Sequence, residues 1–165
     1  MNASPSAPPV DGTHPAFASL ALRDVPRPDY CDVLVVPLPP GAGTDPAAWA
    51  RAVFDVRRGP RWVRALLTLR QGAVRLLGLR PAPRDTFDVR EVVGEEALLA
   101  ADDRHLDFRV GVGVDTRAGL LRVTTAVRLH GWRGRVYFAP VRVAHPLVTA
   151  AMLRSALRRT TRAPS

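Results

Sequence analysis

Carboxylates, a histidine and an arginine alternate in one short segment of the sequence. Their two-residue spacing places them on one face of a predicted β-strand: Asp103, His105, Asp107 and Arg109. A carboxylate beside a histidine can orient the imidazole as a general base, and two carboxylates with one imidazole can bind a divalent metal. However, residues two apart on a strand diverge by roughly 6.5 Å, and nearby arginines neutralise the carboxylates. We therefore interpret the segment as a cross-strand ion-pair network, retain His105 and Asp107 as alternative catalytic candidates, and expect no metal.

His145 is the third catalytic candidate, because it shares a helical face with apolar residues. Tyr137, Val141, Val148 and Met152 recur around it at three- and four-residue spacing. When such a helix packs on a sheet, this face points into the interior. A histidine there can move a proton or anchor a ligand. The alternative is an ordinary core histidine with satisfied hydrogen bonds.

The other reactive residues form no known motif. Cys31 is the single cysteine, so neither an internal disulfide nor a cysteine-based metal site is possible. His14 and His130 have no suitable neighbours in the sequence. We find no Gly-rich phosphate loop, nucleophile elbow or metal-binding helix motif, and expect no cofactor. Gly111 and Gly113 alternate within a strand pattern, which lets a sheet curve or another segment pass close.

A long β-hairpin is predicted to position most of these residues. Apolar residues alternate strictly over 106–114 and again over 121–129, which is typical of two strands with one buried face. A loop at Thr116–Gly119 sets Asp107 opposite Arg128. A two-residue slip would instead oppose two arginines, so we prefer the first register.

The rest of the chain supplies helices to cover this hairpin. Thr44-Asp45-Pro46 is typical of a helix start, and Pro60 begins an amphipathic helix that ends at Leu77 before Gly78. The predicted order is a strand at 32–38, helices at 44–56 and 60–77, strands at 87–93 and 96–101, the hairpin, and a long helix at 135–159. We therefore predict an α+β fold, in which a curved antiparallel sheet wraps around a long C-terminal helix, with two shorter helices after the first strand.

One domain accounts for the 165 residues. We expect a disordered lead-in at 1–20, the domain at 21–159 and a flexible tail at 160–165. The N-terminus lacks a signal-peptide pattern, and we read no segment as a membrane span, so we expect a cytoplasmic protein. The sequence does not predict the oligomeric state.

The net charge is +9, and every one of the 24 basic residues is arginine. A basic chain favours an anionic partner. Because the arginines are spread from Arg23 to Arg162 rather than clustered, we favour a solvated basic surface and expect no nucleic-acid partner.

Element order and several short segments resemble known families. The order resembles the helix-grip fold of the START and birch-pollen-allergen-like superfamily, which includes polyketide cyclase-like proteins. The segments are similar to a bacterial family of unknown function, DUF2867: Asp29–Asp32, Pro37–Pro40, Asp45–Trp49, Arg61–Arg64, Asp102–Arg109, Gly134–Ala139 and His145. Members of that family are uncharacterised, so the resemblance implies a fold but no catalytic residues.

Three functions are compatible with these observations. The first is binding of a small apolar or amphipathic ligand between the sheet and the last helix, by Phe108, Val110, Val112, Val123, Val127, Tyr137, Val141, His145, Val148 and Met152. The second is a cyclase- or isomerase-like enzyme with a buried His or Asp as the proton-transfer group. The third is a basic interaction module for an anionic partner, which would use Arg57, Arg58, Arg61 and Arg64 or the C-terminal arginines.

Overall fold

The computed structural model describes residues 18–76 and 88–160, with side chains placed for all of these except 69–76. His14, most of the predicted lead-in, the predicted helix end at Leu77 and residues 161–165 lie outside the described residues. The elements are, in order, α1 (Leu20–Asp24), β1 (Tyr30–Pro37), α2 (Pro46–Phe54), a 3-10 turn η1 (Val56–Arg58), α3 (Arg61–Leu76), β2 (Val89–Val93), β3 (Glu96–Asp102), β4 (Leu106–Asp115), β5 (Leu120–Leu129) and α4 (Gly131–Thr160).

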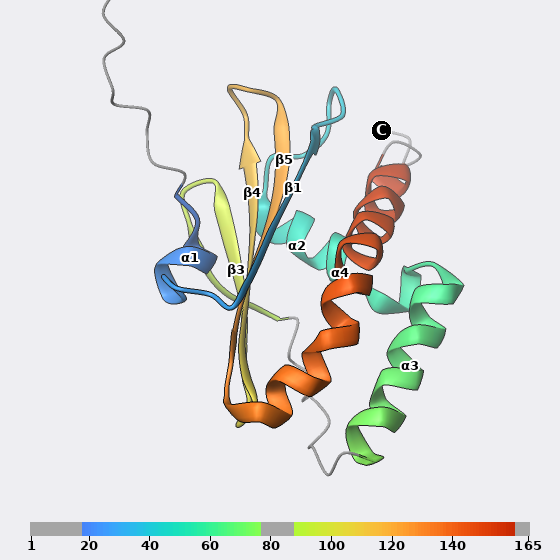
Figure 1. Ribbon diagram of the computed structural model, residues 1–165. Helices are drawn as coiled ribbons and strands as arrows, with labels where there is room; N and C mark the ends of the chain where they lie inside the picture. The colour runs from blue at the N-terminus through green and yellow to red at the C-terminus, as the bar shows by residue number, and fades with distance from the viewer. Residues whose placement is uncertain (1–17, 77–87, 161–165) are drawn as a thin grey trace, which may run out of the picture.

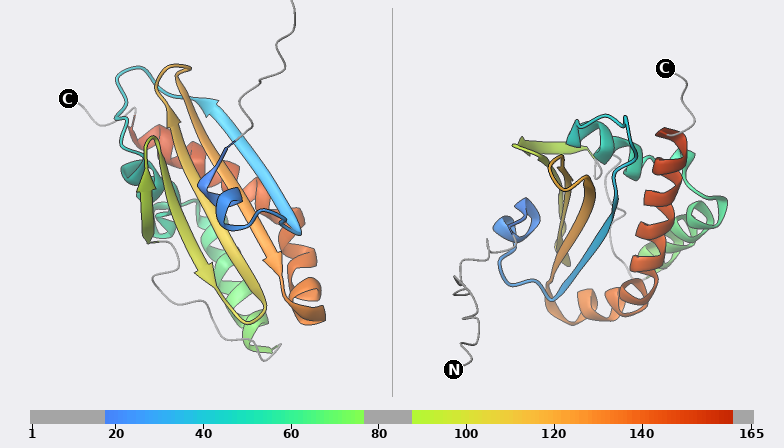
Figure 2. Two further views of the ribbon diagram at one scale, coloured as in Figure 1. Left: turned by 90° about the vertical axis from the view of Figure 1, so that its left-hand side faces the viewer. Right: turned by 90° about the horizontal axis from the view of Figure 1, so that it is seen from above.

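The strands form an open antiparallel sheet in the order β1-β5-β4-β3-β2. The α+β class and the long C-terminal helix are confirmed, and the arrangement is consistent with a helix-grip fold. The central hairpin has the predicted register, with Asp107 opposite Arg128. Figures 1 and 2 show α2, α3 and α4 on one side of the sheet, here called the inner side, and α1 on the other.

Two of the three inner-side helices make the main contacts with the sheet. α2 contacts β2, β3 and β4, whereas α4 contacts the edge strand β1 and packs against α2. Asp45 caps α2 by accepting a hydrogen bond from the Ala47 amide at 2.8 Å, and Pro46 occupies its first turn. On its inner face α2 buries Trp49 and Val53 among the sheet's valines and the last turns of α4. α2 therefore fills the space between the central strands and α4.

The last helix begins earlier than predicted, at Gly131 instead of Arg135. Gly131 adopts a φ of +67°, which is easy only for glycine and lets the chain turn sharply out of β5. Gly134 then lies so close to the carbonyl oxygen of His105 that a Cβ there would collide with it. The two glycines, which look like a break in the sequence, thus allow α4 to start tight against the sheet. Pro140 and Pro146 both lie inside the helix.

The outer side of the sheet carries an element that the sequence did not predict. α1 starts at Leu20, within the predicted lead-in, and Ser19 caps it. Leu20, Ala21 and Val25 pack on Leu98 and Ala126 of the sheet. At the other end of the chain, α4 ends at Thr160, the first residue of the predicted tail.

Substitutions at Gly111 and Gly113 test how closely α1 packs against the sheet. Both lie on the outer side of β4. A Cβ at Gly111 would collide with the Glu96 carboxylate and lie 2.7 Å from Ser19 Oγ, whereas one at Gly113 would make ordinary contacts of 3.4 Å or more with Arg122. We expect Gly111→Ala to lower the free energy of unfolding by about 1–3 kcal/mol and Gly113→Ala to change it by less than about 0.5 kcal/mol. Urea unfolding measures both, and equal effects would contradict the close docking of α1.

Candidate functional site

Three polar side chains meet where β1 passes under the middle of α4. His145 Nδ1 lies 3.1 Å from Asp32 Oδ2, and the Tyr30 hydroxyl donates a hydrogen bond to the same oxygen at 2.9 Å. Strand alternation turns Tyr30 and Asp32 inward, and α4 brings His145 over them. The Asp32 and His145 side chains are only 17% and 15% exposed, so the pair is largely shielded from solvent. We call these three residues the inner polar site.

The electrostatics of the site keep Asp32 ionised and Tyr30 protonated. Burial raises the pKa of Asp32, but hydrogen bonds from His145 and Tyr30 outweigh this effect and bring that pKa below its usual value. Burial and the Asp32 carboxylate raise the pKa of Tyr30 above its usual value. Asp32 is therefore an ionised acceptor and Tyr30 a protonated donor over the whole neutral range.

This arrangement selects one tautomer of His145. Because the Asp32 carboxylate only accepts hydrogen bonds, the proton of the neutral ring must be on Nδ1. Nε2 then carries a lone pair, and it makes no hydrogen bond with any described residue. Thr149 Oγ1 lies 3.5 Å from Nδ1, one helical turn further along. A ring held in this way can accept a proton, or a hydrogen bond from a ligand, through Nε2.

Aromatic packing holds the site from the other side. The Tyr30 ring makes edge-to-face contacts with Phe138 at 5.2 Å and with His145 at 5.6 Å between ring centroids. Such contacts restrict the Tyr30 and His145 rings to one orientation each. Phe138 is buried, so it is a rigid support for Tyr30.

Two buried oxygen atoms, one in the site and one beside it, lack a hydrogen-bond partner among the described residues. They are Asp32 Oδ1 and Thr125 Oγ1, on directly opposed residues of β1 and β5. Thr125 lies near enough to Asp32 to help lower its pKa, yet forms no full hydrogen bond with it. Buried polar atoms without partners are costly, and in proteins water or a ligand usually satisfies them.

The seam between β1 and α4 is less tightly closed than the rest of the inner layer. Leu34 and Val36 of β1 are half-buried, and so are Val141 and Val148 of α4, whereas Val110 and its neighbours in the central strands are fully buried. The inner polar site thus lies where solvent reaches the sheet–helix interface.

The ten residues predicted to bind a ligand all lie in the inner layer, but mostly as packed core. Val110, Val112, Val123 and Met152 belong to the main core with α2, and Phe108 and Val148 pack against it; Tyr137 and Val141 form a separate cluster with Leu106, Val127 is buried, and His145 is in the inner polar site. α2 fills the space over the central strands where we expected a cavity. The ligand-binding role of this set stays a prediction.

Two open hollows lie elsewhere on the surface. One, of about 440 Å³, is on α3 at Arg61, Arg64, Ala65 and Thr68. The other, of about 420 Å³, lies between the start of α3 and the outer face of α4; Pro60, Trp62, Leu147, Ala151, Arg154 and Arg158 line it. None of the predicted ligand-binding residues borders either hollow.

The alternating residues 103–109 are directed to separate partners. His105 precedes β4, and its carbonyl accepts a hydrogen bond from the His130 amide. Asp107 lies 3.0 Å from His130 Nε2 rather than pairing with the opposed Arg128. Within the described residues, no three His, Cys, Asp or Glu side chains are grouped to hold a metal. Neither His105 nor Asp107 is part of the inner polar site.

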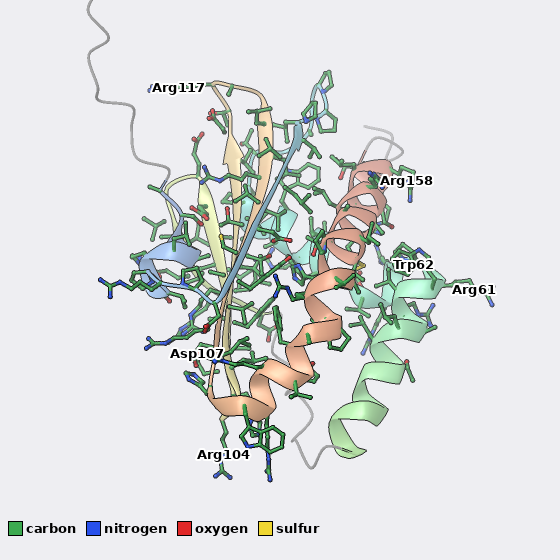
Figure 3. All side chains as sticks on the ribbon, in the orientation of Figure 1. Arg61, Trp62, Arg104, Asp107, Arg117 and Arg158 are labelled. Carbon is green, nitrogen blue, oxygen red and sulfur yellow. The ribbon has the colours of Figure 1, made fainter. Side chains whose placement is uncertain are left out.

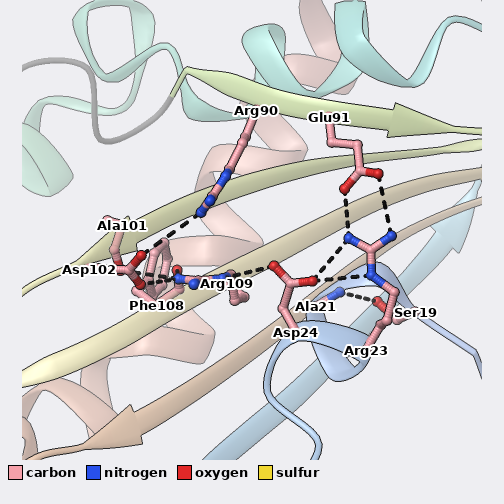
Figure 4. Close-up of polar contacts among 10 residues, drawn as sticks. All are labelled: Ser19, Ala21, Arg23, Asp24, Arg90, Glu91, Ala101, Asp102, Phe108 and Arg109. Atoms are coloured by element: carbon pink, nitrogen blue, oxygen red, sulfur yellow. Dashed lines mark hydrogen bonds and ion pairs between the residues drawn. The ribbon is translucent and has the colours of Figure 1, made fainter.

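Arg109 belongs to an ion-pair network that attaches α1 to the sheet (Figure 4). Its guanidinium pairs with Asp24 of α1 at 3.2 Å and with Asp102 of β3. Arg23, next to Asp24, pairs with Glu91 of β2 at 2.6 Å. Arg109 is thus the member of the alternating set that joins this network, and its partners Asp24 and Asp102 lie outside that set.

By length and apolar composition, α4 could cross a membrane. The core helix of a globular domain passes the same test, and α4 buries Met152, Leu153 and Ala156 against α2 and the sheet. No clear membrane span is therefore shown.

The sequence analysis identified His145 but missed Asp32 and Tyr30. Their signal was present, because both share the inward face of the first strand with Leu34 and Val36 at two-residue spacing. Nothing local, however, indicates that His145, 113 residues away, is their partner.

Opposite tautomers are expected for two histidines. His145 faces its carboxylate through Nδ1, and His130 faces Asp107 through Nε2. In long-range ¹H–¹⁵N spectra at alkaline pH, we expect a proton on Nδ1 of His145 and on Nε2 of His130. Asp32→Asn should remove the His145 preference and leave His130 unchanged. A proton on Nε2 of His145 in the unmodified protein would contradict this geometry.

Asp32 should also contribute stability that depends on pH. Because folding lowers its pKa, this contribution is complete above the unfolded value of about 3.9 and is lost as pH falls through the lower folded value. We expect Asp32→Asn to cost about 1–3 kcal/mol at neutral pH and progressively less in acid, as measured by urea unfolding at a series of pH values. Asp88→Asn is the matched control, since Asp88 is exposed and makes no ion pair with the described residues. A cost that does not change with pH would count against the ionised pair.

Comparison with known proteins gives one match. The model of a family described as "protein of unknown function (DUF2867)" matches residues 25–152, which include β1, the whole sheet and α4 as far as Met152. Neither the comparison with curated proteins nor that with solved structures gives a match.

Proposed function

The chain belongs to the DUF2867 family, whose description gives no activity, and from the inner polar site we propose that it binds a small amphipathic ligand where β1 meets α4. One observation carries the proposal: the shielded carboxylate of Asp32 binds both His145 and Tyr30 through one oxygen, while its second oxygen has no hydrogen-bond partner among the described residues. Burying so many polar groups at a packing interface costs free energy. That cost favours a role for these groups beyond stability.

The surroundings indicate the chemistry of the ligand. His145 Nε2 is available to accept a hydrogen bond, so the polar end of the ligand carries a hydroxyl, amide or similar donor. Half-buried Leu34 and Val148 lie along the same seam and offer apolar contact to the remainder. A ligand with one polar end and a short apolar body fits this combination.

The paired His and Asp also favour a catalytic version of this function. A substrate bound at the seam would lose a proton from carbon or oxygen to His145 Nε2, and Asp32 would stabilise the imidazolium that forms. This is the proton transfer that a cyclase- or isomerase-like reaction needs. In this version His145 is the base, and Asp32 and Tyr30 are positioning residues.

Titration with anilinonaphthalene sulfonate, a fluorescent amphipathic probe, tests the binding site. We expect His145→Ala to weaken probe binding about five- to tenfold, the equivalent of one lost hydrogen bond. His130→Ala and Leu147→Glu should have no such effect, because His130 pairs with Asp107 and Leu147 lies on the outer face of α4. Probe binding that Leu147→Glu abolishes and His145→Ala leaves intact would refute the proposal.

Native mass spectrometry of the purified protein tests the same site with its natural ligand. A co-purified small molecule should be present in the unmodified protein and in His130→Ala but depleted in His145→Ala. Once identified, that molecule can be followed for conversion. Turnover lost in His145→Ala and reduced in Asp32→Asn would support the catalytic version, and unchanged turnover would exclude it.

A further inference from the structure

The two outermost helices of the inner side carry arginines and no acidic residue. All 15 Asp and Glu residues lie outside α3 and α4. The arginines of these helices are Arg61, Arg64, Arg70 and Arg75 in α3, and Arg133, Arg135, Arg142, Arg154, Arg158 and Arg159 in α4. A net charge of +9 is thus concentrated on one part of the molecule rather than spread evenly.

Bulky apolar side chains are exposed among these arginines. Trp62 is 51% exposed, Val143 74% and Leu147 68%. Val143 and Leu147 are one helical turn apart, on the face of α4 opposite to His145, and the hollow between α3 and α4 joins Leu147 to Trp62. We call this surface the outer patch: Arg61, Trp62, Val143, Leu147, Arg154 and Arg158. Figure 3 shows Arg61, Trp62 and Arg158 together on this side of the molecule, away from the sheet.

Ion pairing differs between the arginines around the patch and those on the outer side of the sheet. Arg61, Arg64 and Arg154 form no ion pair with the carboxylates of the part of the chain that the structure describes, whereas Arg23, Arg109 and Arg122 on the outer side of the sheet all do. Uncompensated arginines beside exposed tryptophan and aliphatic side chains suit a partner that is anionic at its surface and apolar just beneath.

We propose that the outer patch docks the domain reversibly on an anionic membrane surface. The arginines would contact lipid phosphates, Trp62 would lie at the level of the headgroups, and Val143 and Leu147 would enter the boundary with the acyl chains. A nucleic acid fits less well, because a phosphate-lined groove offers no apolar environment to Val143 and Leu147. α4 lies along the membrane in this arrangement, since its other face is packed on α2 and β1.

Vesicle co-sedimentation tests the docking. The full chain should bind vesicles of phosphatidylcholine with phosphatidylglycerol but not vesicles of phosphatidylcholine alone. Binding should weaken steeply between low and physiological salt. On binding, the tryptophan emission should shift to the blue. In a Trp132→Phe background, which removes the other exposed tryptophan, Trp62→Phe should lose most of that shift because Trp49 is already buried. Equal binding to both kinds of vesicle, or to neither, would overturn the proposal.

A matched pair of charge reversals locates the contact. Arg154→Glu and Arg117→Glu change the net charge equally, but Arg117 lies in the β4–β5 turn, far from the patch (Figure 3). We expect Arg154→Glu and Leu147→Glu each to reduce vesicle binding about tenfold, and Arg117→Glu to reduce it less than twofold. Both patch residues are exposed, so far-ultraviolet circular dichroism should show an unchanged fold. Equal losses in Arg154→Glu and Arg117→Glu would mean that net charge alone drives binding and would refute the patch.

Two further measurements separate this proposal from its rivals. His145→Ala should bind vesicles normally, because the inner polar site faces away from the patch; failure of ligand binding therefore does not affect the docking test. A 20-base-pair DNA duplex should not compete with anionic vesicles. Duplex binding that Arg154→Glu abolishes, without vesicle binding, would identify a nucleic-acid surface and overturn the membrane assignment.

Discussion

A shielded carboxylate beneath α4 is the constraint on which the functional side of this molecule depends. Asp32 is largely withdrawn from water, so its charge must be met by donors, and His145 and Tyr30 supply them. Each donor is in turn oriented by its neighbours, Tyr30 by Phe138 and His145 by its place on the helix. The need to satisfy one charge thereby fixes a tautomer, a ring orientation and the position of α4 on the edge strand.

α4 serves two environments at once. Its inner face holds His145 over β1 and packs Met152 into the core, whereas its outer face presents Leu147 and arginines to the surroundings. Pro140 and Pro146 lie inside the helix, and each removes one backbone hydrogen bond from it because proline has no N–H. The two proposed functions therefore use opposite faces of the same helix and need not interfere.

The contacts on the outer side of the sheet stabilise the fold. α1 covers Gly111 through close contacts with Ser19 and Glu96, and Arg109 ties Asp24 to the sheet. These ion pairs are mostly half-exposed, so the apolar contacts of Leu20 and Ala21 contribute more to docking than the charges do.

Local patterns in the sequence determined the hairpin and its register, the helix start at Asp45–Pro46 and the inward face of His145, because strand alternation, turn length and helical period act between near neighbours. Tertiary structure alone decided that Asp32 meets His145, that α1 covers Gly111 and that α2 fills the expected cavity. The polar pairs join residues that are 76 or more positions apart in the sequence. The position of α2 depends on how side-chain volumes pack in the core. Neither kind of contact produces a periodic pattern in the sequence.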